Sequence, residues 1–385
     1  MNARLAHYLD HNASAPLLPE SQAAIVSALE FIGNPSSVHV AGRAVRALVD
    51  DAREQVAEAA GAKAKQVVFT GSATEAITQA IVAGSATLNV DEIIVSAGDH
   101  TAALKAAETS GKPVRIIGLT SDGQIDADGL RAAIGTLAET GRSALVAIHL
   151  VNNETGVVQP IAEIEALVGP TPHFLFVDAV QAFGKLPLDF AARATDMMAI
   201  SAHKIGGPAG VGALLVKEHC DTVRLIPGGG QEQGRRGGTE PVALIAGFGA
   251  ATERFPLAYE TAHVADLSAR LENGLQKLSK DVAIFGGGME RVGNTVNFAI
   301  PGYKSSVAMM GLDLEGIAVS SGSACSSGKV GKSHVLEAMS VAPDLMACAL
   351  RVSFGWSSRE EDVDVFLQTF AALIDRHKKR QGEAA

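Results

Sequence analysis

Short apolar runs rich in β-branched residues recur along the first 250 residues, and helical stretches separate them. This alternation is typical of buried parallel strands, because each parallel connection has to cross the sheet through a helix. The runs, each followed by a polar or glycine-containing turn, are Gln66–Thr70, Glu92–Ser96, Ala144–Ile148, Phe174–Val177 and Met197–Ile200. Between them, Ala41–Ala60 has apolar residues at helical spacing and is followed by Gly61, a common helix stop. The pattern predicts an α/β fold with a mostly parallel sheet flanked by helices.

The regular alternation of strand-like and helical segments ends near residue 250. A long helical stretch, a strand, a loop rich in glycine and serine and a final helix follow one another at Glu260–Ser279, Asn294–Phe298, Ser320–Gly331 and Val363–Lys378. With 385 residues, the chain is long enough for two domains at roughly 150 residues each. We expect a large domain over residues 15–250 and a smaller α+β domain formed by residues 1–14 and 251–385.

Composition excludes several classes of protein. With 32 Lys and Arg against 42 Asp and Glu, the net charge is −10, which argues against a nucleic-acid partner. Apolar residues make up 47% of the chain, too many for a disordered protein. Cys220, Cys325 and Cys348 lie far apart, so we expect neither a disulfide framework nor a metal site. Without a leader pattern or a long apolar run, we expect a cytoplasmic protein that is neither exported nor associated with a membrane.

In open α/β sheets, ligands bind beyond the carboxyl ends of the strands, so the residues that follow the runs are the first candidates. Lys204 comes soon after Met197–Ile200 in a stretch with several glycines, where a lysine can form a Schiff base with a carbonyl cofactor. Asp178 follows Phe174–Val177 and can keep a pyridine nitrogen protonated. Taken alone, Lys204 would be an ordinary surface lysine and Asp178 equally a helix N-cap.

Three other strand ends also carry polar groups. The turn Gly71–Thr74 can bind an anion at the start of a helix, although Ser72 and Glu75 also fit an ordinary capping box. His100 can stack on an aromatic ring or move protons, and Asn153 can bind a phenolic oxygen; a structural histidine and a turn asparagine are the alternatives. Together, the five strand ends supply the groups that hold pyridoxal phosphate, which chance explains poorly.

Four longer motifs resemble those of the cysteine desulfurases, within the class V aminotransferases: Asp178–Lys185, Ser201–Lys204, Gly228–Thr239 and Ser321–Cys325. The similarity extends from Tyr8–His11 to Arg351–Gly355, nearly the whole chain. The resemblance implies the pyridoxal-phosphate-dependent transferase fold, like that of aspartate aminotransferase. It also implies a homodimeric enzyme that takes sulfur from L-cysteine and releases L-alanine.

The resemblance also implies a role for each matched position. Lys204 would bind pyridoxal 5'-phosphate as a Schiff base and serve as the catalytic base, Asp178 would pair with the ring nitrogen, and His100 would stack on the ring. Further cofactor contacts would be Asn153 and Gln181 at the ring substituents, Thr74, Ser201 and His203 at the phosphate, Ala73, and Thr239 from the neighbouring subunit. Arg351, with its planar guanidinium, and Asn34 would bind the substrate.

Cys325 distinguishes a desulfurase from an aminotransferase. It lies in the loop 320–331, whose glycines and serines predict an exposed and mobile segment, and an exposed thiol can ionise and attack the substrate sulfur. Cys220 and Cys348 have apolar neighbours and should fill core space. The long loop resembles the iron-sulfur assembly type, so the sulfur acceptor would be an iron-sulfur scaffold, a tRNA-thiolation protein or another acceptor protein.

Two alternatives remain at this stage. One is a selenocysteine lyase or a class V aminotransferase for another amino acid; Cys325 argues against the aminotransferase, because transamination needs no thiol, but leaves selenocysteine open. The other is a catalytically silent relative that serves as a binding or regulatory subunit. Intact Lys204, Asp178, His100 and Cys325 argue against a silent relative.

Overall fold

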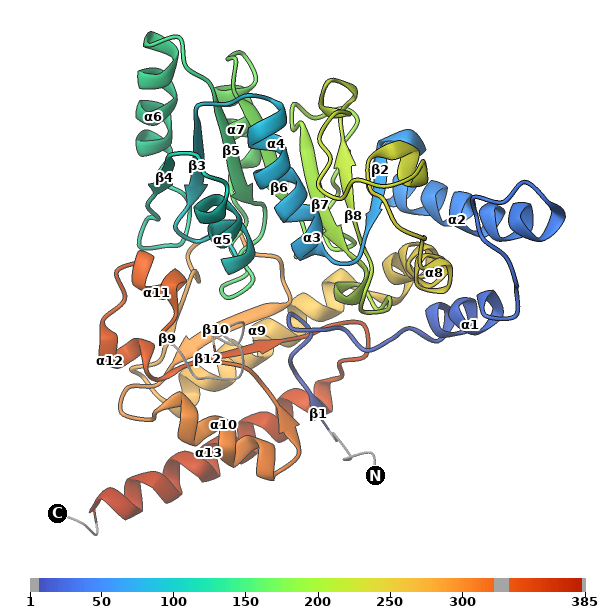
Figure 1. Ribbon diagram of the computed structural model, residues 1–385. Helices are drawn as coiled ribbons and strands as arrows, with labels where there is room; N and C mark the ends of the chain where they lie inside the picture. The colour runs from blue at the N-terminus through green and yellow to red at the C-terminus, as the bar shows by residue number, and fades with distance from the viewer. Residues whose placement is uncertain (1–6, 322–331, 383–385) are drawn as a thin grey trace.

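A seven-stranded mixed sheet forms the centre of the larger part of the computed structural model, which describes residues 7–321 and 332–382 (Figure 1). The strands, in the order β2-β8-β7-β6-β5-β3-β4, are β2 (Val67–Thr70), β3 (Glu92–Ser96), β4 (Val114–Ile117), β5 (Ala144–His149), β6 (Phe174–Asp178), β7 (Met197–Ser201) and β8 (Gly212–Val216). Strands β4, β3, β5, β6 and β7 pair in parallel, whereas β8 is antiparallel to both β7 and β2. The predicted mostly parallel sheet is therefore confirmed, although β4 and β8 were not predicted and β2 pairs in an antiparallel manner.

Alternate residues of the strands pack against two helical layers. In β2, Val67 and Phe69 belong to the core on one face, and Val68 belongs to the core on the other. Helices α2 (Val40–Ala59), α6 (Ala127–Glu139), α7 (Ile161–Val168) and α8 (Val242–Ala258) contribute to the first core. Helices α3 (Ala73–Thr78) and α5 (Thr101–Thr109) contribute to the second, and α4 (Gly84–Thr87) continues the helical stretch of α3. The strands predicted from continuous apolar runs are thus covered on both faces, whereas the edge strand β4 is partly exposed.

Helix α2 closely matches the predicted helix Ala41–Ala60. The side chain of His39 caps its start by accepting the backbone N–H of Gly42, and Gly61 follows its end with φ +60°. Helix α8 packs against α2 and against α1 (Pro19–Ala28). Because α8 runs to Ala258, the expected boundary at residue 250 falls inside a continuous helix.

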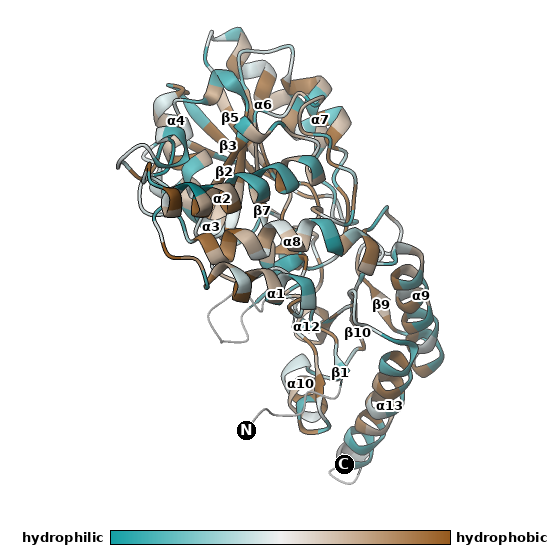
Figure 2. Ribbon diagram, turned by 90° about the vertical axis from the view of Figure 1, so that its right-hand side faces the viewer, coloured by the Kyte–Doolittle hydropathy of each residue, from teal (hydrophilic) through white to brown (hydrophobic). Residues whose placement is uncertain are grey.

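The smaller part is built on an antiparallel sheet in the order β12-β10-β9, with β9 (Ala283–Ile284), β10 (Thr295–Ala299) and β12 (Ala349–Ser353). The short strands β1 (His7–Tyr8) and β11 (Ile317–Ala318) pair beside it. Its helices are α9 (Thr261–Leu278), α10 (Ser305–Leu314), α11 (His334–Ala338), α12 (Pro343–Met346) and α13 (Glu360–Gly382). Helices α9 and α13, which overlap the two helical stretches expected here, lie side by side (Figures 1 and 2).

Two of the three cysteines can be placed. Cys220 and Cys348 are buried free thiols, in agreement with the prediction that they fill core space. Cys325 lies outside the described residues. Every helix in the described part of the chain is either too short or too polar to cross a lipid bilayer.

Candidate functional site

A cavity of about 360 Å³ lies beyond the carboxyl ends of the parallel strands, where β12 of the smaller part approaches the large sheet (Figure 1). The structure brings many of the predicted site residues together in its wall: Ala73, Thr74, His100, Asn153, Asp178, Gln181, His203, Lys204 and Arg351. These residues come from six separate segments of the sequence, so their meeting is a consequence of the fold. The residues that follow the strands thus line one cavity at the carboxyl ends of the sheet, where open α/β sheets bind ligands.

Lys204 ends a 3₁₀ turn, Ala202–Lys204, that directly follows β7. Its Nζ donates hydrogen bonds to the backbone carbonyl oxygens of Asn12 at 2.6 Å and Ala13 at 2.8 Å. The segment after β1 thus holds the lysine amine at the wall of the cavity. An amine in this position can react with a carbonyl compound that enters the cavity.

Asp178 is the last residue of β6 and is buried. Burial raises the pKa of its carboxyl to about 6, against the opposing effect of the Val180 N–H, which donates to Oδ1 at 3.0 Å. Such a carboxyl gains a stable charge when a cation lies beside it. A protonated ring nitrogen would be a suitable partner.

Two histidines in the cavity are neutral near neutral pH. His100 caps α5, since its Nδ1 accepts the N–H of Ala102 at 3.2 Å, so the neutral ring carries its proton on Nε2. Burial, followed by the charge of Lys204, lowers the pKa of His100 to about 4. The same two causes lower the pKa of His203 to about 4. A neutral imidazole is suited to stacking on an aromatic ring.

The turn between β2 and α3 presents backbone N–H groups to the cavity. Ser72 caps α3 by accepting the N–H of Glu75 at 3.2 Å, whereas the N–H groups of Ala73 and Thr74 belong to the first turn and have no partner within the helix. Gly212 lies against this turn: a Cβ at residue 212 would come within 2.9 Å of the Ala73 nitrogen. The cap that was considered as an alternative is present, and the turn can still bind an anion.

Arg351 reaches the cavity from β12 and is only 2% exposed. Its Nη1 donates to the carbonyl oxygen of Asn153 at 2.9 Å, and its Nη2 pairs with Asp10 at 2.8 Å. Its Nε is buried and lacks a hydrogen-bond partner among the residues that the structure describes. The guanidinium therefore joins the two parts of the molecule and retains unused capacity to bind a carboxylate.

Both ends of the Gln181 amide are occupied. Its Nε2 donates to the Asn12 carbonyl at 3.0 Å, and its Oε1 accepts from Lys185 at 3.1 Å. Burial, followed by the charges of Lys204 and Arg351, lowers the pKa of Lys185 to about 7. At the wall of the cavity, Gln181 thus bridges the segment after β1 and Lys185.

Other predicted residues do not reach the cavity within this chain. Asn34 is exposed in the α1–α2 connection, and its side chain accepts the N–H of Ser36 at 2.9 Å. Thr239 is exposed, and Ser201 is buried at the end of β7 outside the wall of the cavity. Their roles stay predictions, Thr239 as a residue offered to a neighbouring subunit. The same holds for Cys325, which lies outside the described residues.

Sequence reasoning missed several lining residues, notably Asn12 and His149. The strand predicted to stop at Ile148 includes His149, so the strand-end signal was available but was assigned only to Asn153. Asn12 had no such signal, because it follows a two-residue strand of the smaller part. Its position depends on the contact between the two parts.

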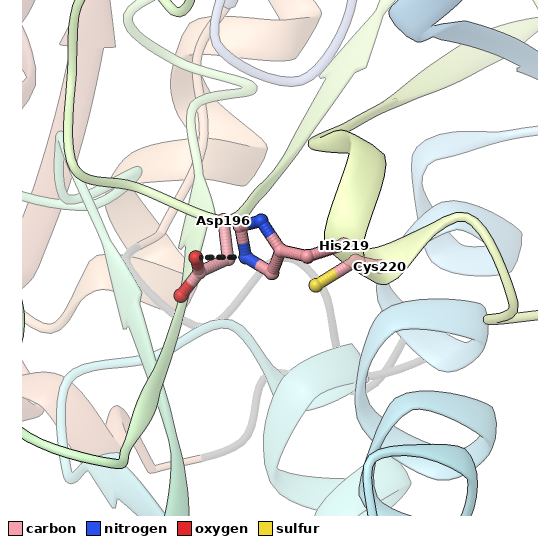
Figure 3. Close-up of side chains that lie close together, drawn as sticks. All are labelled: Asp196, His219 and Cys220. Atoms are coloured by element: carbon pink, nitrogen blue, oxygen red, sulfur yellow. Dashed lines mark hydrogen bonds and ion pairs between the residues drawn. The ribbon is translucent and has the colours of Figure 1, made fainter.

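A second cluster of reactive side chains lies at the opposite ends of the strands from the cavity (Figure 3). Asp196 precedes β7, while His219 and Cys220 follow β8, and their ligand-type atoms lie within 4.8 Å of one another. Asp196 accepts from His219 at 2.7 Å and from the N–H of Leu175 at 2.7 Å. Burial raises the pKa of Cys220 to about 12, so the thiol keeps its proton. These contacts describe a hydrogen-bonded pair beside a buried, protonated cysteine.

Comparisons with known proteins agree with this geometry. The family model described as aminotransferase class-V matches residues 7–366. A cysteine desulfurase from Nostoc sp. is 38% identical over 96% of this chain and 93% of its own. The solved structure of a NifS-like protein from Rickettsia africae has a TM-score of 0.86 and 31% identity over 96% of this chain and 99% of that chain. A structure titled SspA in complex with cysteine has a TM-score of 0.80 and 29% identity over 91% of this chain and 99% of that chain.

The match covers both parts of the molecule, including the cavity between them and every predicted site residue. The identity exceeds the level at which a family relationship is secure over this length. The chain belongs to the class-V aminotransferase family and, within it, groups with the cysteine desulfurases.

Proposed function

We propose that this protein is a cysteine desulfurase that uses pyridoxal 5'-phosphate to convert L-cysteine to L-alanine and carries the sulfur as a persulfide on Cys325. The observation that carries the proposal is the meeting of Lys204, Asp178 and Arg351 in one cavity. An amine for an aldehyde, an acid for a ring nitrogen and a guanidinium for a carboxylate are the groups that the cofactor and an amino-acid substrate require. The relatives named cysteine desulfurase and the structure titled with cysteine support the choice of substrate.

The residues present fit the cofactor. Lys204 would hold its aldehyde carbon, the N–H groups of Ala73 and Thr74 would bind its phosphate, and the neutral ring of His100 would lie against the pyridine. When bound, pyridoxal phosphate supplies an electron sink that stabilises negative charge at the Cα of the substrate. Asp178 would keep the ring nitrogen protonated, because a buried carboxylate beside a cation is stable as an ion.

The protein's own groups would carry the remaining steps. Arg351 would bind the carboxylate of L-cysteine with the part of its guanidinium that Asn153 and Asp10 leave available. Lys204 would remove the Cα proton as a general base and return a proton later. The Cys325 thiolate would attack the sulfur of the substrate, forming an S–S bond while the Cβ–S bond breaks; the electron pair stays on Cβ, which is protonated, and alanine is released.

The described residues on either side of the Cys325 segment support its part in the reaction. Before it, Ser320 exchanges two backbone hydrogen bonds with Arg351, at 3.1 and 2.7 Å. After it, the hydroxyl of Ser333 donates to Glu154 at 2.5 Å, next to Asn153. Both ends of the segment are therefore fixed close to residues of the cavity.

A second subunit belongs to the proposal. Several large apolar side chains are exposed around the α1–α2 connection, namely Leu29, Phe31, Ile32, Val38 and Val40. A patch of this kind is typical of a surface that another protein covers. In a homodimer, Asn34 and the exposed Thr239 would lie at or near that interface. A protein that accepts the persulfide sulfur, such as an iron-sulfur scaffold, would be a further partner in a reducing cytoplasm.

The decisive experiment compares Cys325→Ser with the parent protein. Both should show the visible absorbance of the bound cofactor, but the variant should lose sulfide and alanine production from L-cysteine by about a hundredfold or more, because the nucleophile is missing. Cys220→Ala is the matched control, because Cys220 is buried and lies at the end of the strands away from the cavity. This variant should keep the activity of the parent. Normal turnover by Cys325→Ser would contradict the role of Cys325, and a keto acid in place of alanine would identify an aminotransferase.

A further inference from the structure

His149 lines the cavity and forms a buried pair with Asp99 behind it. Asp99 ends the turn after β3, and His149 is the last residue of β5. They are 1% and 4% exposed, and His149 Nδ1 lies 2.6 Å from Asp99 Oδ1. Gly98 makes the close approach possible, because a Cβ there would come within 3.1 Å of the His149 ring. None of the roles assigned above uses this pair.

The hydrogen bonds of Asp99 determine which nitrogen of His149 carries a proton. Besides Nδ1, the Asp99 carboxylate accepts the backbone N–H of His149 at 2.8 Å and that of Ser96 at 2.8 Å. Because the carboxylate only accepts, His149 Nδ1 must donate. In addition, Nε2 of His334, on α11 of the smaller part, lies 2.9 Å from the carbonyl oxygen of Asp99. The aspartate is thus fixed from three elements, and the imidazole is fixed by the aspartate.

The other nitrogen of His149 lacks a partner. Nε2 is buried and makes no hydrogen bond within the part of the chain that the structure describes. A buried polar atom of this kind is costly in free energy unless a partner arrives in another state of the protein. Since His149 lines the cavity, that partner belongs to the loaded site.

Asp178 is the group closest in register to His149. The two residues are direct partners across the parallel strands β5 and β6, so their side chains leave the same face of the sheet. Burial raises the pKa of Asp178 to about 6 and the charge of Asp99 adds to the rise, whereas positive charge on His149 or Lys204 lowers it. The other titratable groups that line the cavity are His100, His203 and Arg351.

A cationic His149 would compensate the second of two buried carboxylates in the loaded site. Asp99 follows β3 and Asp178 ends β6, with β5 and its His149 between these two strands, and a protonated ring nitrogen would neutralise one of the two buried carboxylates. A second positive charge between the carboxylates would neutralise the other. It would also favour the ionised form of Asp178, because Asp178 is the direct strand partner of His149.

Resting on the proposed function, we propose that Asp99 and His149 are a positioning pair in which the imidazole, protonated on both nitrogens when pyridoxal phosphate is bound, holds Asp178 as a carboxylate for the ring nitrogen. Asp99 supplies the charge that retains the second proton on His149. The pair thereby selects the protonated ring, which is the form that acts as an electron sink.

The test measures the affinity of the cofactor-stripped protein for pyridoxal 5'-phosphate as a function of pH. In His149→Asn, the amide can still donate to Asp99 but carries no charge. The pKa of Asp178 should therefore rise by about one unit. We expect about tenfold weaker binding than the parent near pH 6 and nearly equal binding near pH 8. His173→Asn is the matched control, because this buried histidine lies at the other end of β5 and β6 and accepts the N–H of Ala144.

A second measurement remains valid if the variant folds poorly. Nitrogen-15 spectra of the histidine-labelled, cofactor-loaded parent should show protons on both nitrogens of His149 near neutral pH. A neutral His149, an unchanged pH profile in His149→Asn, or a loss of affinity that is equal at every pH would overturn the inference alone. A parent protein that binds no pyridoxal phosphate would overturn the proposed function and the inference together.

Discussion

Strands β7 and β8 carry reactive side chains at both of their ends. At the cavity end, Lys204 follows β7; at the opposite end, Asp196 precedes β7 while His219 and Cys220 follow β8 (Figures 1 and 3). The types of residue are those that catalytic sites use in either case. The two ends differ in how their polar atoms are satisfied.

At the Asp196 end, the carboxylate accepts two hydrogen bonds and His219 is largely exposed to water. At the cavity end, His149 Nε2 and Arg351 Nε are buried without partners among the described residues. The pKa of Asp178 is raised to about 6, and that of Lys185 is lowered to about 7, in both cases mainly by burial. A cluster of titratable groups thus indicates a site when burial leaves its charges uncompensated, and residue type alone does not.

The largest expected effect comes from replacing each of the two lysines that follow these strands by alanine, in separate variants. Lys204→Ala should lose the visible absorbance of lysine-bound pyridoxal phosphate and reduce sulfide production by about a thousandfold or more, because the amine is both anchor and base. Lys217→Ala should keep both, since Lys217 follows β8 at the opposite end, where it donates to the Ala191 carbonyl and lies over the Phe190 ring. Spectra and sulfide assays of the two variants measure the difference. Persistent absorbance in Lys204→Ala would mean that another lysine is the anchor.

The next effect concerns two aspartates, one at each end of the sheet. Burial raises the folded-state pKa of Asp178 from 3.8 to about 6, so the ionised carboxylate destabilises the cofactor-free protein. This free-energy penalty is absent at pH values below the unfolded-state pKa and complete at pH values above the folded-state pKa. It therefore develops as pH rises from about 4 to about 6. Asp178→Asn should therefore raise the free energy of unfolding by at most about 3 kcal/mol near pH 8 and by little near pH 4.

Asp196→Asn is the control for Asp178→Asn and should have the opposite sign. Asn at residue 196 weakens hydrogen bonds that the carboxylate makes to Leu175 and His219, so the free energy of unfolding should fall by about 1 kcal/mol. Urea unfolding of both variants at two pH values provides the measurement. A loss of stability in Asp178→Asn near pH 8 would show that its carboxylate is compensated in the free protein, and the contrast between the two ends would fail.

Local sequence patterns were sufficient for most of the large sheet and for helix α2. The runs of β-branched residues marked β2, β3, β5, β6 and β7 because parallel strands are buried on both faces. Strand β4 was not predicted because Arg115 interrupts its short apolar run, as an edge strand with an exposed face allows. The antiparallel direction of β8 is set by its pairing with β7 and β2, which no local pattern encodes.

The residues of the site likewise fall into two groups, those that local sequence patterns predict and those that depend on tertiary contacts. Asp178, His100 and Lys204 could be predicted because each follows a strand whose end defines the edge of the cavity. Asn12 could not be, and Arg351 was found only through the family resemblance, because both depend on how the smaller part meets the large sheet. These contacts join residues more than 190 positions apart in the sequence.

The smallest expected effect tests the Asp196 end directly. His219→Ala removes a hydrogen bond to Asp196 from an imidazole that is 56% exposed, and such surface contacts contribute less than about 1 kcal/mol to the free energy of unfolding. Affinity for pyridoxal phosphate and sulfide production should not change, because the cavity lies beyond the other end of β7. Zinc should also affect parent and variant alike, since burial raises the pKa of Cys220 to about 12 and withholds the thiolate that zinc prefers. Melting curves with and without zinc give the measurement, and a zinc-dependent stabilisation of the parent that His219→Ala abolishes would make this cluster a metal site and erase the distinction between the two ends.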